Sequence, residues 1–162
     1  MPRPDRSFYA QTKAFGRFGI RWFDPVLMEV EHFHGHIELN WLTDGSMDYL
    51  FDNRPLEIPS RRLVMFWAGI PHQTVSIDPG PQGNARQCNV YLPLDSFLHM
   101  PKLGHLTETM MGGGIVALSP ETIGEDTLTR WFQDYRSGDA ERTDILKEEI
   151  AIHLEEQSSL FQ

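Results

Sequence analysis

The sequence predicts a mainly β fold, an antiparallel barrel or sandwich, followed by C-terminal α-helices. Short apolar segments separated by turn residues extend from residue 26 to residue 92, the spacing expected of antiparallel strands. No helix-length pattern interrupts them, which weighs against a parallel sheet. Helical periodicity begins only after residue 94. We therefore expect a β-barrel with an N-terminal arm over residues 1–94 and a mainly helical extension over residues 95–162, both within one domain.

Six short segments are expected to form the strands. Each combines β-branched or aromatic residues with flanking turn signals such as Asp44-Gly45 and Pro59-Ser60. The segments are residues 26–31, 38–42, 47–51, 63–67, 73–77 and 87–92. Residues 2–19 are polar and irregular, so we expect them to form the N-terminal arm.

The second part of the chain predicts four helices. Residues 95–99 and 106–111 form two short ones, and Ser119 with Pro120 is typical of the start of a third. Apolar residues at positions i, i+3, i+4 and i+7 continue that third helix to about Gly138. They are Leu128, Trp131, Phe132 and Tyr135. A fourth helix is expected over residues 140–157, with an apolar face of Leu146, Ile150 and Leu154.

These two apolar stripes also predict an assembly. A barrel of this size can be covered by one helix, so two large stripes leave apolar surface that needs another partner. An isologous contact between two copies would bury it. We expect a homodimer formed through the C-terminal helices.

Composition and charge exclude several classes of protein. The 162 residues include 18 aromatics, enough for a packed core, and no apolar segment approaches the length of a membrane helix. A net charge of −9 gives no electrostatic footprint for nucleic acid. The single cysteine, Cys88, excludes an intrachain disulfide and fits a reducing compartment. We expect a cytoplasmic protein that does not itself bind DNA and does not associate with membranes.

The segment Glu31-His-Phe-His-Gly-His-Ile-Glu-Leu carries the most chemical information. His32, His34, His36 and Glu38 share one parity, so a continuous strand would present three imidazoles and a carboxylate on one face. These groups suit zinc, iron, nickel or manganese. His72 could complete the set from a facing strand. A strand break at the glycine within this segment would weaken the parity argument.

The motif spacing resembles that of the cupins. His32-x-His34-x-x-x-Glu38, followed by six residues and Gly45, is similar to the first cupin motif, and Gly69-x-x-His72 to the core of the second. The resemblance implies a cupin-type antiparallel β-barrel (double-stranded β-helix). It also implies that the three histidines and Glu38 hold one divalent metal: Zn, Ni, Fe or Mn. The alternative is a metal-free, hydrogen-bonded polar cluster, as in many regulatory cupins.

A narrower resemblance covers nearly the whole chain. Residues 32–40, 50–53, 66–73 and 91–98 look like the N-terminal half of AraC-type transcription activators. This implies an effector-sensing and dimerisation domain that binds a small, sugar-like ligand in the cupin pocket. DNA would be bound only through a helix-turn-helix half absent from this chain, which stops at Gln162.

Three further residues are candidates for effector contact. Trp41 and Trp67 could stack on a sugar, although an aromatic on a strand more often packs in a core. His36 belongs with them rather than with the metal ligands, because the cupin pattern does not use it. The alternative function is a metal-dependent cupin enzyme, of the dioxygenase or sugar isomerase type. Because no acid–base pair stands beside the ligand set, we expect no enzyme and no catalytic residues.

Overall fold

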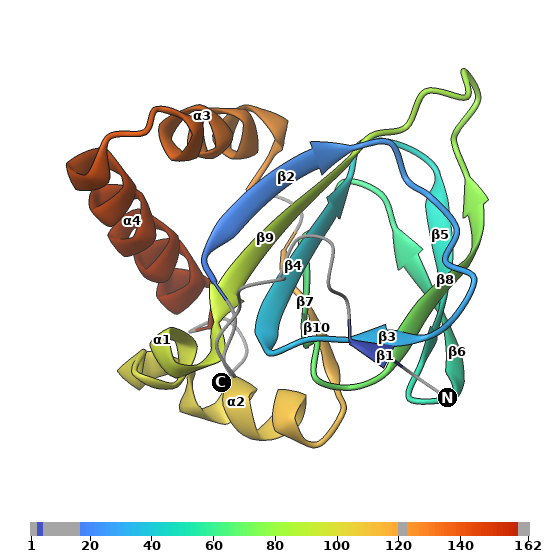
Figure 1. Cartoon of the computed structure of the whole chain (residues 1–162), viewed down its shortest axis with the longest axis horizontal. Coiled ribbons are helices and arrows are strands. Elements are labelled where there is room, and N and C mark those ends of the chain that lie inside the picture. Colours follow the sequence, from blue (N-terminus) through green and yellow to red (C-terminus); the bar gives the residue numbers. More distant parts are fainter. Residues whose placement is uncertain (1–2, 5–16, 120–122, 159–162) are drawn as a thin grey trace.

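Two five-stranded β-sheets face one another, and the main helices lie outside one of them (Figure 1). The structure is a computed structural model that describes residues 3–4, 17–119 and 123–158. The predicted fold class, a cupin-type barrel followed by C-terminal helices, is confirmed.

Strands distant in the sequence are neighbours in each sheet. The first sheet has the order β1 (Arg3–Pro4), β3 (His32–Phe33), β8 (His72–Asp78), β5 (Ser46–Phe51) and β6 (Arg54–Pro59). The second has the order β10 (Ile115–Ala117), β7 (Val64–Trp67), β4 (His36–Leu42), β9 (Gln87–Pro93) and β2 (Gly19–Phe23). Neighbouring strands pair antiparallel, except for the short parallel pair of β1 and β3.

The helices follow the last long strand. They are α1 (Leu94–Leu98), the 3₁₀ helix η1 (Pro101–Leu103), α2 (Gly104–Met111), α3 (Glu125–Arg136) and α4 (Ala140–Ser158). In Figure 1, α3 and α4 lie on the outer side of the second sheet, away from the first sheet. Among the described helices, none is long and apolar enough to cross a membrane.

Alternation along the second sheet separates two environments. On β4, Ile37, Leu39 and Trp41 belong to the apolar core between this sheet and the helices. The opposite face of β4 points into the barrel and carries Glu38 and Asn40, both buried. Because successive strand residues point to opposite faces, one strand serves both the helix-side core and the barrel interior.

The apolar stripes of α3 and α4 are buried within the single chain. Leu128, Trp131, Leu146, Ile150 and Leu154 are each at most 1 % exposed and belong to the core beside the second sheet. The premise that these stripes exceed what one chain can cover is therefore wrong. Both helices pack on the same chain, and Phe132 and Tyr135 are partly buried against the same core.

Several elements differ from their predictions. Residues 26–31 form no strand: one backbone bond, from Met28 N–H to the Thr74 carbonyl, ties the segment to β8, and Val26 is 61 % exposed. Pro25, which lacks an N–H for a ladder, precedes the segment. Strands β1, β2, β6 and β10 are not among the segments predicted from the sequence. Helix α3 begins at Glu125 rather than at Pro120, which lies outside the described residues, as does most of the N-terminal arm.

Candidate functional site

The histidine-rich segment crosses from one sheet to the other at Gly35. His32 and Phe33 form β3 in the first sheet, whereas β4 starts at His36 in the second. The backbone N–H of His34, between them, donates to the Ala68 carbonyl at 2.9 Å. The strand break that was the alternative expectation therefore occurs, and simple parity does not explain how the histidines meet.

Strand pairing brings the histidines together instead. His32 lies directly opposite His72 in the β3–β8 register, with ring centroids 4.5 Å apart. The His34 ring lies 5.7 Å from that of His72 and 6.0 Å from that of His32. One ring nitrogen from each of the three lies within 4.8 Å of the other two. The structure thus forms a three-histidine cluster at one end of the barrel.

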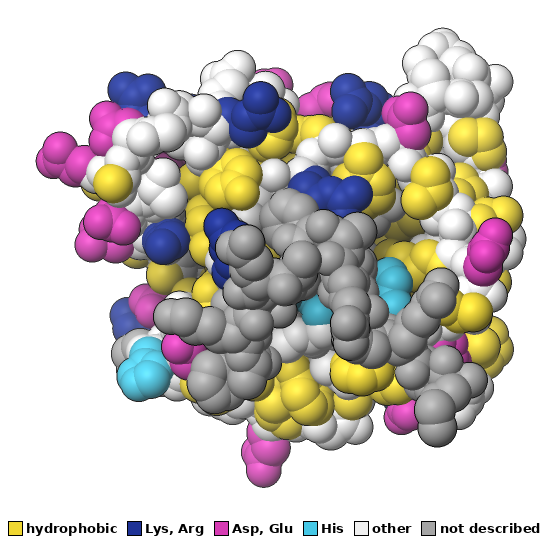
Figure 2. Space-filling model, viewed as in Figure 1, with side chains coloured by type: hydrophobic (Ala, Val, Ile, Leu, Met, Phe, Trp, Pro, Cys, Tyr) yellow, Lys and Arg dark blue, Asp and Glu magenta, His cyan; other side chains and the backbone are white. Residues whose placement is uncertain are grey.

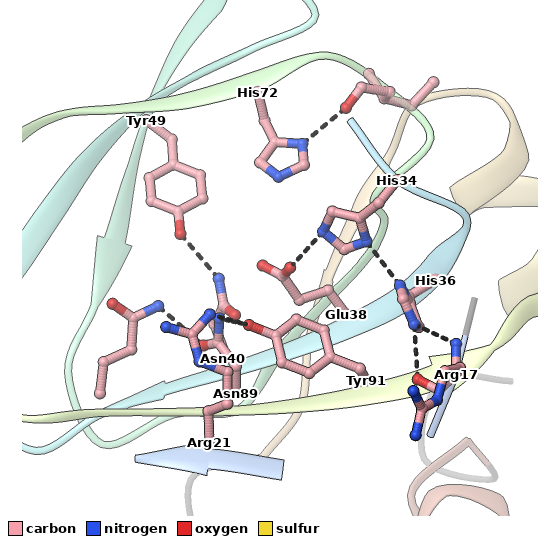
Figure 3. Close-up of polar contacts among 12 residues, drawn as sticks. Arg17, Arg21, His34, His36, Glu38, Asn40, Tyr49, His72, Asn89 and Tyr91 are labelled. Carbon is pink, nitrogen blue, oxygen red and sulfur yellow. Dashed lines mark hydrogen bonds and ion pairs between the residues drawn. The ribbon is translucent and has the colours of Figure 1, made fainter. Parts of the chain in front are cut away.

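His72 presents an unpaired nitrogen to this cluster. Its Nδ1–H donates to the Ile70 carbonyl at 2.8 Å, so Nε2 carries the lone pair. That Nε2 atom is buried and has no hydrogen-bond partner among the described residues (Figure 3). Burial lowers the pKa of His72 to about 4, which keeps the imidazole neutral. One ring nitrogen from each of three clustered imidazoles is a donor set that fits a borderline divalent metal.

Glu38 joins the site through His34 rather than through the cluster itself. Its Oε1 lies 3.1 Å from His34 Nε2, and both side chains are buried. The four predicted metal ligands therefore meet in one place, as three histidines and a carboxylate bonded to one of them.

His36 continues the same chain of contacts away from the barrel. Its Nδ1 lies 2.8 Å from His34 Nδ1, and its Nε2 lies 2.7 Å from both the backbone N–H nitrogen and the carbonyl oxygen of Arg17 (Figure 3). Burial, and after it the neighbouring His34, lower the pKa of His36 to about 4. Glu38, His34, His36 and the Arg17 backbone form one hydrogen-bonded row. His36 is fully buried and does not line the cavity.

A cavity of about 210 Å³ lies beside the cluster. Its polar wall includes Arg21, His32, His34, Glu38, Tyr49, Thr74, Gln87, Asn89 and Tyr91, and its apolar wall Phe23, Val26 and Met28. Histidine side chains are visible near the middle of the face shown in Figure 2, close to hydrophobic side chains. The cavity is therefore a polar pocket inside a barrel whose other layers are apolar.

The β9 wall of the cavity is a ladder of hydrogen-bonding side chains. Gln87 Nε2 donates to Asn89 Oδ1 at 2.9 Å, and Asn89 Nδ2 donates to the Tyr91 hydroxyl at 3.0 Å. Arg21 Nη1 lies 3.5 Å from the same hydroxyl. Gln87, Asn89 and Tyr91 are not among the candidates predicted from the sequence. The alternation of Gln87, Asn89 and Tyr91 with apolar Cys88, Val90 and Leu92 is the signal that marks them.

Two more groups face the barrel interior. Asn40 Nδ2 donates to the Tyr49 hydroxyl at 3.0 Å, while Asn40 Oδ1 is buried without a partner among the described residues. Burial, reinforced by the charge of Glu38, raises the pKa of Tyr49 far above its usual value, so its phenol stays neutral.

The structure does not place Trp41 or Trp67 in the cavity. Trp41 is 1 % exposed and packs edge-on against Trp22 with centroids 6.4 Å apart. Trp67 packs against the helix-side core and covers Gly69, where an added Cβ would lie 2.4 Å from the indole. Both tryptophans lie on the sheet face that points away from the barrel interior, which corrects the expected ligand contacts.

Known proteins give one clear relationship. No protein-family profile matches the sequence. The melibiose operon regulatory protein of Escherichia coli (strain K12) is 27 % identical over 157 residues, which cover 94 % of this chain and 48 % of that protein. The protein of the same name from Escherichia coli O6:H1 gives the same values. This chain is homologous to an AraC-type regulator. The resemblance to AraC-type N-terminal domains is confirmed, and the chain spans about half the length of the curated relatives it matches.

One solved structure supports the fold of this chain. The AraC-like transcriptional activator CuxR aligns with a TM-score of 0.50 and 12 % identity over 76 % of this chain and 42 % of that one. ToxT from Vibrio cholerae O395, bound to a naphthalenyl butenoic acid, gives a TM-score of 0.48 and 12 % identity over 88 % and 57 % of the two chains. At 12 % identity, the similarity to CuxR supports only the architecture of this chain.

Proposed function

We propose that this chain is the effector-sensing domain of an AraC-type transcription regulator and binds a small polar ligand inside the barrel. The polar cavity carries this proposal. Two residues packed against its lining have buried polar atoms without partners among the described residues: His72 Nε2, beside His34, and Asn40 Oδ1, whose side chain donates to Tyr49. Burying a polar atom is costly unless it forms a hydrogen bond, so a bound ligand that supplies partners would be stabilised.

The size and lining of the cavity favour a sugar-like ligand. Carboxylate, amide, imidazole and phenol groups surround it, and all of them bond readily to hydroxyls. Its volume of about 210 Å³ is below the roughly 300–1,000 Å³ of typical ligand pockets. One sugar ring is therefore the favoured occupant, and a disaccharide would extend through the opening. The relative's name makes melibiose and galactose the first compounds to test.

One divalent metal is part of the proposal. His32, His34 and His72 would hold it, with Glu38 orienting His34 through their hydrogen bond. A metal there would act as a Lewis acid that anchors ligand oxygens.

DNA binding belongs to a helix-turn-helix half outside this chain. The net charge of −9 opposes contact with phosphates. We expect the isolated chain to give no discrete complex with DNA in a low-salt gel-shift experiment. As part of a transcription regulator it would act in the cytoplasm.

A homodimer through the C-terminal helices remains a prediction. Because the inward stripe of α4 is buried, a contact between copies has to use its outward face, where Ile145 and Ile152 are 57 % and 55 % exposed. Sedimentation of the wild type and of the double variant Ile145→Glu/Ile152→Glu tests this. A wild type that stays monomeric at high micromolar concentration contradicts it.

Thermal unfolding of the purified chain with galactose, melibiose, zinc or nickel tests the function. A sugar-dependent rise in Tm without turnover is the expected result, because a ligand that binds only the folded state stabilises it. Tyr91→Phe should reduce the rise, whereas Asn84→Ala, in an exposed loop, should not. Bound metal with turnover of the sugar would instead favour the enzyme alternative.

A further inference from the structure

Glu38, His34, His36 and the Arg17 backbone form a row of hydrogen bonds. Each bond runs from a donor to an acceptor, so the whole row has a direction. We propose that the His34–His36 pair relays metal occupancy of the barrel to the backbone of Arg17 by reversing a single hydrogen-bond chain. The inference rests on the metal site proposed above, and it concerns His36, which that site does not include.

Without a metal, each bond in the row fixes the next. A Glu38 carboxylate only accepts, so His34 donates to it through Nε2–H at 3.1 Å. A neutral His34 then has a bare Nδ1, which must accept from His36 Nδ1–H at 2.8 Å. A neutral His36 is left with a bare Nε2, which accepts the Arg17 backbone N–H at 2.7 Å. The row runs from Arg17 toward the cavity.

A metal reverses this order. His34 Nδ1 is bonded to His36 Nδ1 at 2.8 Å, closer than the roughly 3.3 Å between two nitrogen ligands of a tetrahedral zinc, so His34 ligates zinc through Nε2. Ligation removes the proton from Nε2, and neutral His34 then carries its proton on Nδ1. His34 Nδ1–H must donate to His36 Nδ1, so His36 carries its proton on Nε2. That Nε2–H donates to the Arg17 carbonyl oxygen, which also lies 2.7 Å away.

The proton count is unchanged by the reversal. One proton leaves His34 Nε2 for solvent, the shared proton moves from His36 Nδ1 to His34 Nδ1, and one proton from solvent reaches His36 Nε2. Both histidines are neutral before and after. A sugar hydroxyl that only accepts from His34 Nε2–H leaves the direction as it was, so the row distinguishes a metal from a hydroxyl.

The row of hydrogen bonds ends at Arg17, close in sequence to a strand that lines the cavity. Arg17 lies two residues before β2, the strand that carries Arg21 into the cavity wall. Reversal replaces the bond from the Arg17 N–H with a bond to the Arg17 carbonyl. The peptide groups on either side of Arg17 therefore exchange hydrogen-bonding states at the entry of β2.

Nitrogen-15 NMR of histidine-labelled protein measures the tautomers directly, with and without one equivalent of zinc. We expect His34 in the Nε2–H form and His36 in the Nδ1–H form without zinc. With zinc, His34 should be in the Nδ1–H form and His36 in the Nε2–H form, and the Arg17 amide proton should exchange faster. A His36 Nε2–H form already present without zinc overturns the relay.

Two variants separate the relay from the metal site. His72→Gln should abolish zinc binding and leave His36 in the Nδ1–H form when zinc is added. His36→Phe should weaken zinc binding about 10- to 100-fold, because it removes the partner that orients His34. Zinc bound at His34 and His72 with no change at His36 overturns the relay and leaves the metal site standing. If neither His34 nor His72 responds to zinc, the relay and the proposed metal site are both overturned.

Discussion

His32 and His72 face each other across the β3–β8 pair, 40 residues apart in sequence, with their rings edge to face at 4.5 Å. Strand β3 contains only two residues, and this is the single register pair that joins it to β8 among the described residues. The metal-ligand geometry therefore depends on a two-residue strand that lies between β1 and β8 in the first sheet.

The first prediction concerns zinc. His72→Gln should lose at least 100-fold in zinc affinity, because it removes the buried nitrogen that has no other partner. Isothermal titration calorimetry of protein purified without a nickel resin measures this. His105→Gln, on the exposed side of α2, is the matched control and should bind one equivalent like the wild type.

The second prediction concerns the β9 wall of the cavity. Asn89→Ala removes the central member of the β9 ladder, and we expect it to weaken binding of a stabilising sugar about two- to tenfold, the effect of one hydrogen bond. Titration calorimetry with the sugar that raises Tm checks this. Asn84→Ala in the exposed loop makes the same chemical change away from the cavity. Equal losses of sugar affinity in both variants would contradict the role of the β9 wall in binding.

The sequence predicts the architecture well because its local patterns are strong. The alternation in β4 and β9 and the i, i+4 repeat in α4 each reflect one element packing on one core. Helix α4 starts at Ala140 as expected and extends one residue beyond the predicted end. These elements could be recognised without knowing their neighbours.

The candidate site is predicted only in part because it depends on pairing between distant strands. The motif identifies His32, His34, Glu38 and His72, and the structure brings all four together. Where the helices pack decides which face of β4 and β7 points into the barrel, and no local pattern shows that Trp41 and Trp67 lie on the helix side. Strand β10 is three residues long and is defined by its pairing with β7, which leaves no local signal.

The third prediction is a loss of stability in mild acid. Burial lowers the pKa of both His36 and His72 to about 4, against about 6.5 in the unfolded chain. Between these values the unfolded state binds protons that the folded state does not, so stability is full above pH 6.5 and falls as the pH drops toward 4. Each histidine contributes up to about 1.4 kcal/mol per pH unit.

Urea denaturation at several pH values between 7.5 and 4.5 measures this slope. His72→Gln should flatten it, because one of the two buried histidines with a lowered pKa is gone. Equal slopes in the wild type and His72→Gln would show that His72 is not held neutral by burial.

The fourth prediction uses neighbouring residues on α4. Leu146 is 1 % exposed in the helix-side core, so Leu146→Ala should cost about 2–5 kcal/mol of unfolding free energy through lost burial and a cavity. Ile145 is 57 % exposed, and Ile145→Ala should change stability by less than about 0.5 kcal/mol. Denaturant titration at low protein concentration, where assembly does not contribute, separates them. A small loss for Leu146→Ala would contradict the packing of α4.

The last prediction concerns Gly45 and the reason that its position requires glycine. Gly45 joins β4 to β5 with φ +72°, and a Cβ on it would lie 1.9 Å from the Asp78 carbonyl oxygen, which belongs to the backbone of β8. Gly83 has φ +67° with open space around its Cα. Alanine costs about 1–2 kcal/mol at either position from the left-handed backbone alone. Gly45→Ala must also push β8 away from the turn, so we expect its unfolding free energy to fall clearly further than that of Gly83→Ala. Denaturant titration of the two variants side by side measures the difference, and equal losses would mean that the turn needs only the left-handed backbone and not the close approach of β8.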